Sequence, residues 1–239
     1  MLKQLTLLIL MVSLSFGAWA VSIYEIQFTS NSGSDGTYPS RYIGKNVSTE
    51  GVVTATNYKN GGYFISETLN GPWRGIYVSD RDASVNTGDI VRITGTVSET
   101  FGMTCLQDIS QIRILSSNNP LPQPVLLTTG QLSRADEAEA YEGVYARLLN
   151  TTSTGSKNFR SKMQVTDGSG TCFVINDLFS PKGMTKSTSA SSHYTSITGV
   201  VVYGFSEFAL GPIATTDMII QQPKFIQNRS WGKIKSIYK

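Results

Sequence analysis

Short hydrophobic runs rich in Val, Ile, Thr, Tyr and Phe recur along the chain, each bounded by residues that favour turns. In the first half these runs span residues 47–55, 62–67, 75–80 and 89–98. Asn-Gly-Gly, Asn-Gly-Pro and Thr-Gly-Asp sequences separate them, and no long stretch has the period of an amphipathic helix. The pattern predicts an all-β fold of short strands, with a helical turn or two within 129–141.

The second half of the chain repeats the first. Four motifs return in the same order, and the offset between copies changes only between motifs, where insertions belong in loops. The motifs at 50–53, 63–67, 75–80 and 93–97 return at 142–145, 163–167, 172–177 and 197–201, with offsets of 92, 100, 97 and 104 residues. We therefore infer two copies of one structural unit, each of about a hundred residues.

Each copy has the same layout. One strand is followed by a hairpin of two short strands, then by a long strand and a final strand. The long strand contains an interior glycine, Gly95 or Gly199, which allows the sharp bend of a small barrel. Five strands that close in this order form the OB-fold. The sequence thus predicts two tandem five-stranded OB-fold barrels at residues 21–117 and 127–222, joined by a stiff Pro-rich linker at 118–126.

The first copy also resembles a known family. The residues that carry the resemblance are Gly44 and the segments 50–55, 62–65, 73–78 and 88–97. They are similar to the OB-fold domains at the N-termini of secreted bacterial endonucleases and related extracellular proteins. The match covers nearly all of the first copy and, more weakly, the second. It implies a bacterial, exported OB-fold protein associated with nucleases, but the separate catalytic domain of those nucleases has no counterpart here.

The first twenty residues have the pattern of a secretory signal peptide. Lys3 provides a positive start, residues 5–16 are almost continuously apolar, and Ala18-Trp19-Ala20 places small residues before a cleavage site. The apolar run is too short to span a membrane. We expect cleavage after Ala20 and a soluble protein that is secreted or periplasmic, with an uncleaved anchor as the alternative.

Residues that could perform catalysis are few. The 239-residue chain has one histidine, His193, and no Gly-x-Ser-x-Gly, Gly-Lys-Ser/Thr or Cys-x-x-Cys sequence. We therefore expect a non-catalytic protein without cofactor or metal, although Asp80, Asp82 and Asp167 leave a calcium site as an alternative. The two cysteines, Cys105 and Cys172, leave two alternatives, an interdomain disulfide or two separate buried thiols. The first needs an oxidising compartment.

The charges are nearly balanced but unevenly placed. The chain has 20 Lys and Arg against 17 Asp and Glu. Five of the basic residues lie in the tail at 223–239, so residues 21–222 carry 14 basic and 17 acidic groups. Proteins that follow a phosphate backbone usually have a basic body. The tail is amphipathic after Ser230, and it can dock on a barrel, bind an acidic surface, or serve as an export or anchoring signal.

Strand alternation predicts which side chains point into the barrels, because residues i and i+2 share a face. Apolar residues of the hairpin strands have apolar counterparts in the second copy. The expected inward set is Tyr63, Ile65, Ile76 and Val78, matched by Met163, Val165, Phe173 and Ile175. The opposite face of the second copy then carries no aromatic residue, since its expected members are Gln164, Thr166, Gly170, Cys172 and Val174.

The opposite face of the first copy is the predicted ligand-binding face. It carries the aromatic residues Phe64, Trp73 and Tyr77, with Arg74 beside them and Lys59 in the preceding loop. OB-folds bind bases or sugars on this face, and stacked bases contribute about 1–3 kcal/mol each. The alternative is that these aromatics pack beneath the N-terminal segment or against the second copy.

Two functional classes follow. The first is a non-catalytic exported protein that binds single-stranded DNA or RNA on the aromatic face. The fold, the resemblance and the basic tail support it, whereas the acidic body counts against it. The second is an extracellular module that binds a protein or a glycan and has no affinity for nucleic acid. Neither class requires insertion into a membrane.

Overall fold

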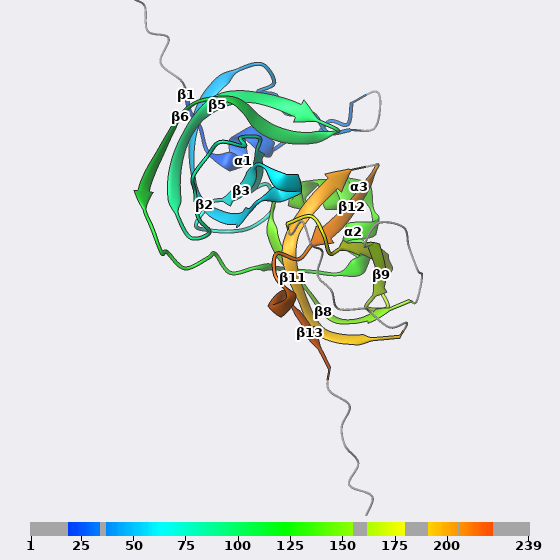
Figure 1. Ribbon diagram of the computed structural model, residues 1–239. Helices are drawn as coiled ribbons and strands as arrows, with labels where there is room; N and C mark the ends of the chain where they lie inside the picture. Colours follow the sequence, from blue (N-terminus) through cyan, green and yellow to red (C-terminus); the bar gives the residue numbers. More distant parts are fainter. Residues whose placement is uncertain (1–18, 34–36, 155–161, 180–190, 205, 222–239) are drawn as a thin grey trace, which may run out of the picture.

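The polypeptide forms two β-sheets that lie one above the other in Figure 1. The structure is a computed structural model that describes residues 19–33, 37–154, 162–179, 191–204 and 206–221. Strands account for far more of these residues than helices do, which confirms the prediction of a mostly β protein. Among the described residues, no helix has the length and apolar character needed to cross a membrane.

The second sheet contains a closed five-stranded barrel. The strands of this sheet are β7 (Val125–Leu127), β8 (Tyr145–Ser153), β9 (Lys162–Thr166), β10 (Thr171–Ile175), β11 (His193–Gly204), β12 (Glu207–Gly211) and β13 (Met218–Ile220), and the barrel consists of β8, β9, β10, β12 and β11. The order is β13-β11-β12-β10-β9-β8-β7, and β11 also pairs with β8, which closes the ring. The core inside it is built from apolar residues of all five strands, including Leu148, Val165, Val174, Ile197 and Leu210.

The first sheet has six strands with related pairings. They are β1 (Trp19–Ala20), β2 (Asn46–Thr56), β3 (Tyr63–Ser66), β4 (Gly75–Val78), β5 (Ile90–Thr100) and β6 (Met103–Ser116). The order is β1-β2-β3-β4-β6-β5, and β2 also pairs with β5. Its core contains Val53, Ile65, Ile76, Ile93 and Leu106.

Gly95 lies in β5 opposite Val47 of β2. The β5–β6 register shifts between Thr94 and Thr96. A Cβ atom on Gly95 would lie 2.6 Å from Cδ1 of Ile109 and 3.0 Å from the carbonyl oxygen of Gln107, so a side chain there would displace the end of the Ile109 side chain. The bend predicted at this glycine stays a prediction.

The helical segments are short. They are α1 (Ile23–Gln27), η1 (Tyr58–Asn60), α2 (Thr129–Ser133), α3 (Ala135–Ala138), η2 (Glu139–Tyr141) and η3 (Thr215–Asp217). The helical turns expected within 129–141 are present as α2, α3 and η2. The helix α1 was not among the predicted elements, and it begins with a capping box between Ser22 and Glu25.

Both ends of the chain bear on predictions made from the sequence. Residues 1–18 of the predicted signal peptide and the tail at 223–239 lie outside the described residues. Trp19 and Ala20, also assigned to the signal peptide, form β1 and pair in parallel with Val47 and Ser48 of β2. The N–H of Val21 donates to the carbonyl of Ser48 at 3.0 Å. The signal peptide itself stays a prediction.

One predicted register in the second copy was wrong by one residue. In the first sheet Ile65 pairs with Ile76, and in the barrel of the second sheet Val165 pairs with Cys172. Cys172 and Val174 therefore correspond to Ile76 and Val78, and both are buried in the barrel core. Phe173 and Ile175 were expected inside the barrel, but they point outward and are half-buried. The reason is that a one-residue slip in register moves every side chain of a strand to the other face.

Candidate ligand-binding site

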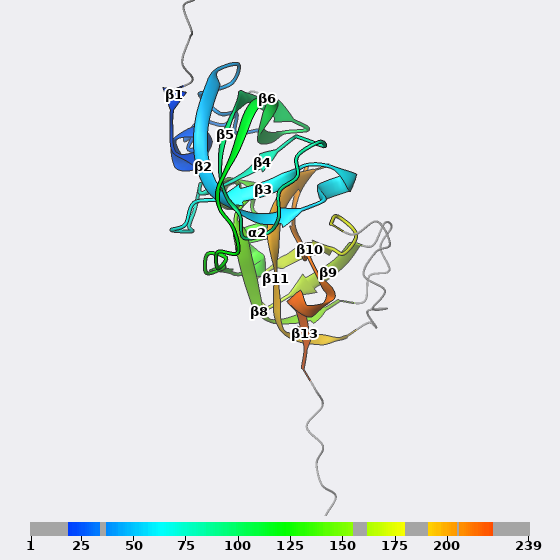
Figure 2. The same cartoon turned by 60° about the vertical axis from the view of Figure 1, so that its left-hand side comes forward.

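A third apolar cluster lies between the two sheets and covers the predicted ligand face. Figure 2 shows β3 and β4 facing the second sheet. Phe64 is fully buried, and its ring centroid lies 5.3 Å from that of Tyr77 and 6.0 Å from that of Phe179 of the second unit. Tyr58 packs against all three rings. In this arrangement Phe64 has no surface to offer a ligand, because the aromatic residues of β3 and β4 form an interface.

Tyr77 and Lys59 also belong to this boundary. Tyr77 is half-buried, and burial raises the pKa of its hydroxyl. Lys59 is exposed, with its Nζ 5.0 Å from the ring centroid of Tyr58. The backbone N–H of Lys59 donates to the carbonyl of Leu178 at 2.8 Å. These two predicted residues therefore lie where the first unit contacts the second.

Trp73 and Arg74 occupy a different place, in the turn between β3 and β4. The Trp73 ring meets Phe28 edge to face at 5.6 Å, and Phe28 stacks on Tyr24 at 5.3 Å with an interplanar angle of 11°. The Arg74 guanidinium lies over Tyr24, 5.3 Å from its centroid, and forms an ion pair with Glu67.

Arg41 completes this group, with its Cζ 5.9 Å from the Phe28 ring centroid. Arg41 is exposed, and the other four members are half-buried. We call Tyr24, Phe28, Arg41, Trp73 and Arg74 the aromatic platform. Tyr24 contacts both Phe28 and Arg74, whereas among the described residues the Trp73 indole has one ring contact, with Phe28.

The sequence places two platform residues through the local structure of α1. Ile23, Ile26 and Gln27 are buried, which leaves Tyr24 and Phe28 together on the outer side at i and i+4. The side-chain N–H of Gln27 donates to the carbonyl of Gly75 at 2.7 Å and holds α1 against β4. The Ser-x-x-Glu capping box at 22–25 was the available sequence signal for this helix, and the sequence analysis did not use it.

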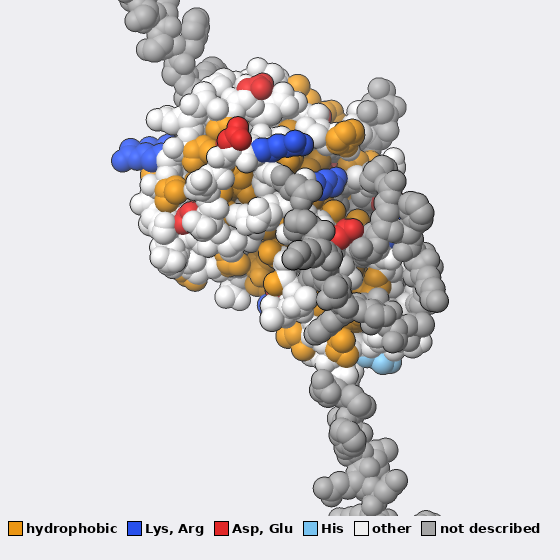
Figure 3. Space-filling view, viewed as in Figure 1, with side chains coloured by type: hydrophobic (Ala, Val, Ile, Leu, Met, Phe, Trp, Pro, Cys, Tyr) orange, Lys and Arg blue, Asp and Glu red, His pale blue; other side chains and the backbone are white. Residues whose placement is uncertain are grey.

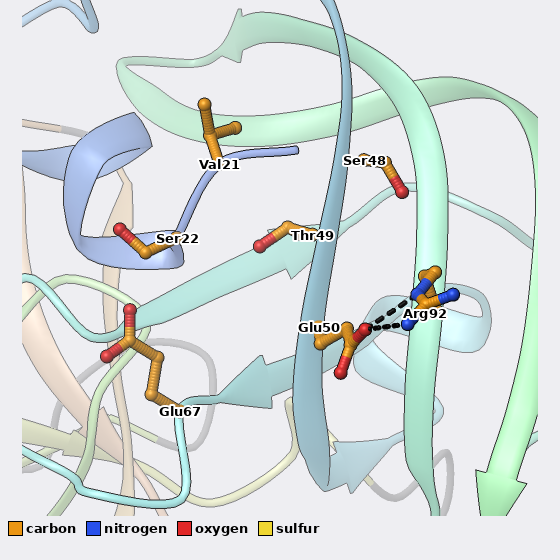
Figure 4. Close-up of a pocket in the computed structure, with 7 residues that line it drawn as sticks. All are labelled: Val21, Ser22, Ser48, Thr49, Glu50, Glu67 and Arg92. Carbon is orange, nitrogen blue, oxygen red and sulfur yellow. Dashed lines mark hydrogen bonds and ion pairs between the residues drawn. The ribbon is translucent and has the colours of Figure 1, made fainter. Parts of the chain in front are cut away.

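A shallow polar pocket adjoins the platform at Glu67. It has a volume of about 700 Å³ and is lined by Val21, Ser22, Ser48, Thr49, Glu50, Glu67 and Arg92. In Figure 4 Glu50 pairs with Arg92 on one side, and Glu67 lies beside Ser22 on the other. The Glu67 carboxylate accepts from the Tyr24 N–H at 2.9 Å. The Thr49 hydroxyl is buried without a hydrogen-bond partner among the described residues.

Three carboxyl groups converge at the boundary between the units. Glu142 is buried, and its Oε1 accepts from the Thr104 N–H at 2.9 Å, while Oε2 has no partner among the described residues. Glu99 accepts from the Thr104 hydroxyl at 2.6 Å. Burial, and then the charge of Glu99, raises the pKa of Glu139 to about 8. Burial raises the pKa of Glu142 well above its usual range, and the charges of Glu139 and Glu99 add to this effect.

The described residues contain no group of three or more His, Cys, Asp or Glu side chains arranged to hold a metal ion. Asp167, a calcium candidate from the sequence, accepts hydrogen bonds from Thr129 and Ser169. These bonds lower its pKa to about 2 against the opposing effect of burial. Asp167 therefore ties the β9–β10 turn to the start of α2.

Comparison with known proteins gives no family assignment. No family model matches the chain, and no curated protein matches it. One solved structure that it is similar to is "Molecular basis for abrogation of activation of pro-inflammatory cytokines" (14% identity, 75% of this chain and 94% of that chain, TM-score 0.35). Another is "Structure of murine DNA binding protein bound with ds DNA" (9% identity, 74% and 97%, TM-score 0.34). These TM-scores are too low for either match to support a fold or a function.

Proposed function

We propose that this protein is an exported, non-catalytic binding protein of two OB-type barrels, and that it binds single-stranded nucleic acid on the aromatic platform. The strand pairings of the first sheet, in which β2 pairs with both β3 and β5, support a second barrel. The resemblance to N-terminal domains of secreted bacterial endonucleases supports export and the ligand class. Secretion or a periplasmic location is part of the same proposal.

One observation carries the ligand proposal. Trp73 lies beside the stacked pair of Phe28 and Tyr24, with the cations Arg41 and Arg74 next to the rings. Aromatic rings stack on bases of any sequence, and adjacent arginines can contact phosphates. In this proposal Trp73 and Arg74 are ligand-binding residues, whereas Phe64, Tyr77 and Lys59 lie at the boundary between the two units.

The charge distribution limits the expected affinity. On the face shown in Figure 3, basic and acidic side chains are interspersed and form no continuous basic patch. Stacking must then supply more of the binding free energy than phosphate neutralisation does. We expect micromolar affinity for short single strands, with a shallow dependence on salt concentration.

A second candidate is a glycan ligand, and the pocket beside Glu67 favours it. Its walls combine hydroxyl groups of Ser22 and Ser48 with carboxylates of Glu50 and Glu67. Hydroxyl and carboxylate groups next to an aromatic ring suit the alternating polar and apolar faces of a sugar. In this reading Trp73 stacks on a sugar ring instead of a base.

Fluorescence anisotropy separates the two candidates. A labelled dT oligonucleotide, a duplex and a neutral oligosaccharide are titrated with the full chain at about 50 and 200 mM salt. We expect the single strand to bind and Trp73→Ala to weaken binding by about 1–3 kcal/mol. Phe101→Ala is the matched control, because Phe101 is 86% exposed in the β5–β6 turn. Binding of the oligosaccharide alone supports the glycan candidate, and failure of all three ligands to bind contradicts both.

A further inference from the structure

The turn that carries Trp73 and Arg74 belongs to the first sheet, but the second unit holds it in place. The Asn70 side-chain amide donates to the carbonyl of Tyr145 in β8 at 2.7 Å and to that of Gln123 in the linker at 3.0 Å. Its Oδ1 accepts from the Gly71 N–H at 3.0 Å. A single side chain thus connects the turn, the linker and the second barrel.

The backbone of Trp73 shows why this attachment matters. Trp73 has a φ of 66°, in the left-handed region that bulky residues rarely adopt. Such a conformation persists only where the surroundings impose it. The N–H of Trp73 donates to the carbonyl of Ala140 in η2 at 2.5 Å, and this bond to the second unit fixes the peptide group of Trp73.

The end of the turn is fixed in the same way. At the start of β4, the Gly75 backbone packs directly against that of Gly143, leaving no space for a side chain on either residue. From Asn70 to Gly75, the turn is therefore attached to the second unit at both ends and at Trp73 between them. Within the first unit, the turn is held by the ion pair between Arg74 and Glu67 and by the Glu67 N–H, which donates to the carbonyl of Arg74 at 2.9 Å.

We propose that the second unit positions the ligand-binding platform of the first, and that Asn70 is the positioning residue through which it acts. This inference rests on the proposed function, because the platform is the site whose affinity it explains. If the bonds from Asn70 are lost, Trp73 relaxes out of the left-handed region and its indole leaves Phe28. Ligand affinity then depends on how the two units dock, although no residue of the second unit touches the ligand.

The test uses Asn70→Asp, which keeps the side-chain shape and the acceptor for Gly71 but replaces the amide donor with an oxygen that faces two carbonyls. The background is the full chain with Trp19→Phe and Trp231→Phe, so that Trp73 is the one tryptophan left. Leu69→Ala is the matched control, since Leu69 lies in the same turn and is 73% exposed. Asn70→Ala removes the donors without adding charge, and it replaces Asn70→Asp if that variant does not fold.

We expect Asn70→Asp to shift the Trp73 emission to longer wavelength, to increase its quenching by acrylamide, and to weaken oligonucleotide binding roughly fivefold or more. All three measurements are made well below the melting temperature, where a merely stabilising residue would change none of them. Unchanged emission and affinity in a folded Asn70 variant would overturn the inference, and so would a shifted emission with unchanged affinity. If the parent chain binds no oligonucleotide, the proposed function fails, and the emission arm still decides whether Asn70 positions Trp73.

Discussion

Gly75 of β4 and Gly143 meet backbone to backbone across the boundary between the two units. A Cβ atom on Gly143 would lie 2.8 Å from the carbonyl carbon of Gly75, and a Cβ atom on Gly75 would overlap the carbonyl group of Gly143. Gly143 also has a φ of 71°, which favours glycine. This contact allows β3 and β4 to approach the second unit closely enough for Phe64 to be fully buried.

Gly75→Ala should therefore force the two units apart. Overpacking of this kind costs about 1–3 kcal/mol, and here both neighbours are backbone and cannot rotate away. The expected result is a lower melting temperature together with greater exposure of apolar surface to a hydrophobic dye. Gly204→Ala is the control, because no atom lies within 4 Å of the added Cβ. Equal melting temperatures for the two variants would contradict the tight contact.

The buried carboxyl groups should make the protein less stable as the pH rises. The pKa of Glu139 is about 8 in the folded state against 4.5 for an ordinary glutamate, and that of Glu142 is also raised. Between about pH 4.5 and pH 8 the folded state therefore binds more protons than the unfolded state. The contribution of these carboxyl groups to stability is complete below about pH 4.5 and is lost as the pH rises through 8. Thermal melts at a series of pH values measure the effect.

Glu142→Gln should flatten this pH dependence, because glutamine is neutral and keeps an acceptor for the Thr104 N–H. Above pH 8 we expect the variant to be more stable than the parent by about 1–3 kcal/mol, the range for a buried unsatisfied polar group. Glu50→Gln, at an exposed ion pair, is the control and should leave the pH profile unchanged. A variant that follows the parent profile at every pH would refute the assignment.

The capping box of α1 should matter both to stability and to the platform. Ser22→Ala removes the hydroxyl that accepts from the Glu25 N–H at 3.1 Å, and loss of such a cap costs about 0.5–2 kcal/mol. Because α1 carries Tyr24 and Phe28, oligonucleotide affinity should also fall. Substitution of the exposed Ser30 by alanine should change neither property. Melting curves and anisotropy titrations measure the two effects independently.

The two cysteines should be unreactive in the native protein. Both are free and buried, and burial raises the pKa of Cys105 to about 11 and that of Cys172 to about 12. The thiolate is the reactive form, so a thiol reagent at neutral pH should label neither residue until the protein unfolds. In denaturant without reductant, two thiols per chain should react. A count of zero there would indicate a disulfide.

Export predicts a defined N-terminus. Cleavage after Ala20 makes Val21 the first residue, and its nitrogen already lies 3.0 Å from the carbonyl of Ser48. The intact mass of the protein recovered outside the cytoplasm should therefore match residues 21–239, unless the tail is also removed. Ala20→Arg should prevent cleavage and leave the precursor associated with the membrane.

The sequence predicted the strands well because alternation and turn residues act locally. All four strands expected between residues 47 and 98 are present, and the inward positions of Tyr63, Ile65, Ile76 and Val78 are confirmed. The second copy lacks a comparably clear pattern at β10, where each residue from Cys172 to Ile175 is apolar. Alternation cannot fix the register of such a strand, and the pairing with β9 decides it.

The candidate site could be predicted only in part. Trp73 and Arg74 fall between two predicted strands and Phe64 and Tyr77 fall within them, but the sequence does not show which of these residues the second unit covers. Which aromatics are covered depends on how two copies pack together, and the Gly75–Gly143 contact that decides it joins residues far apart in the chain. Tyr24 and Phe28 join the platform because Gln27 holds α1 against β4, a contact between residues far apart in the chain.

The cluster around Phe64 also determines how this molecule can be divided. Tyr145, Leu178, Val200 and Ala209 of the second unit complete that cluster. A cut through the linker would therefore leave each half with an exposed apolar surface, and neither half should remain monomeric when produced alone. Although the repeated motifs indicate two copies of one unit, the shared cluster joins the two halves, and we expect them to melt in one cooperative step.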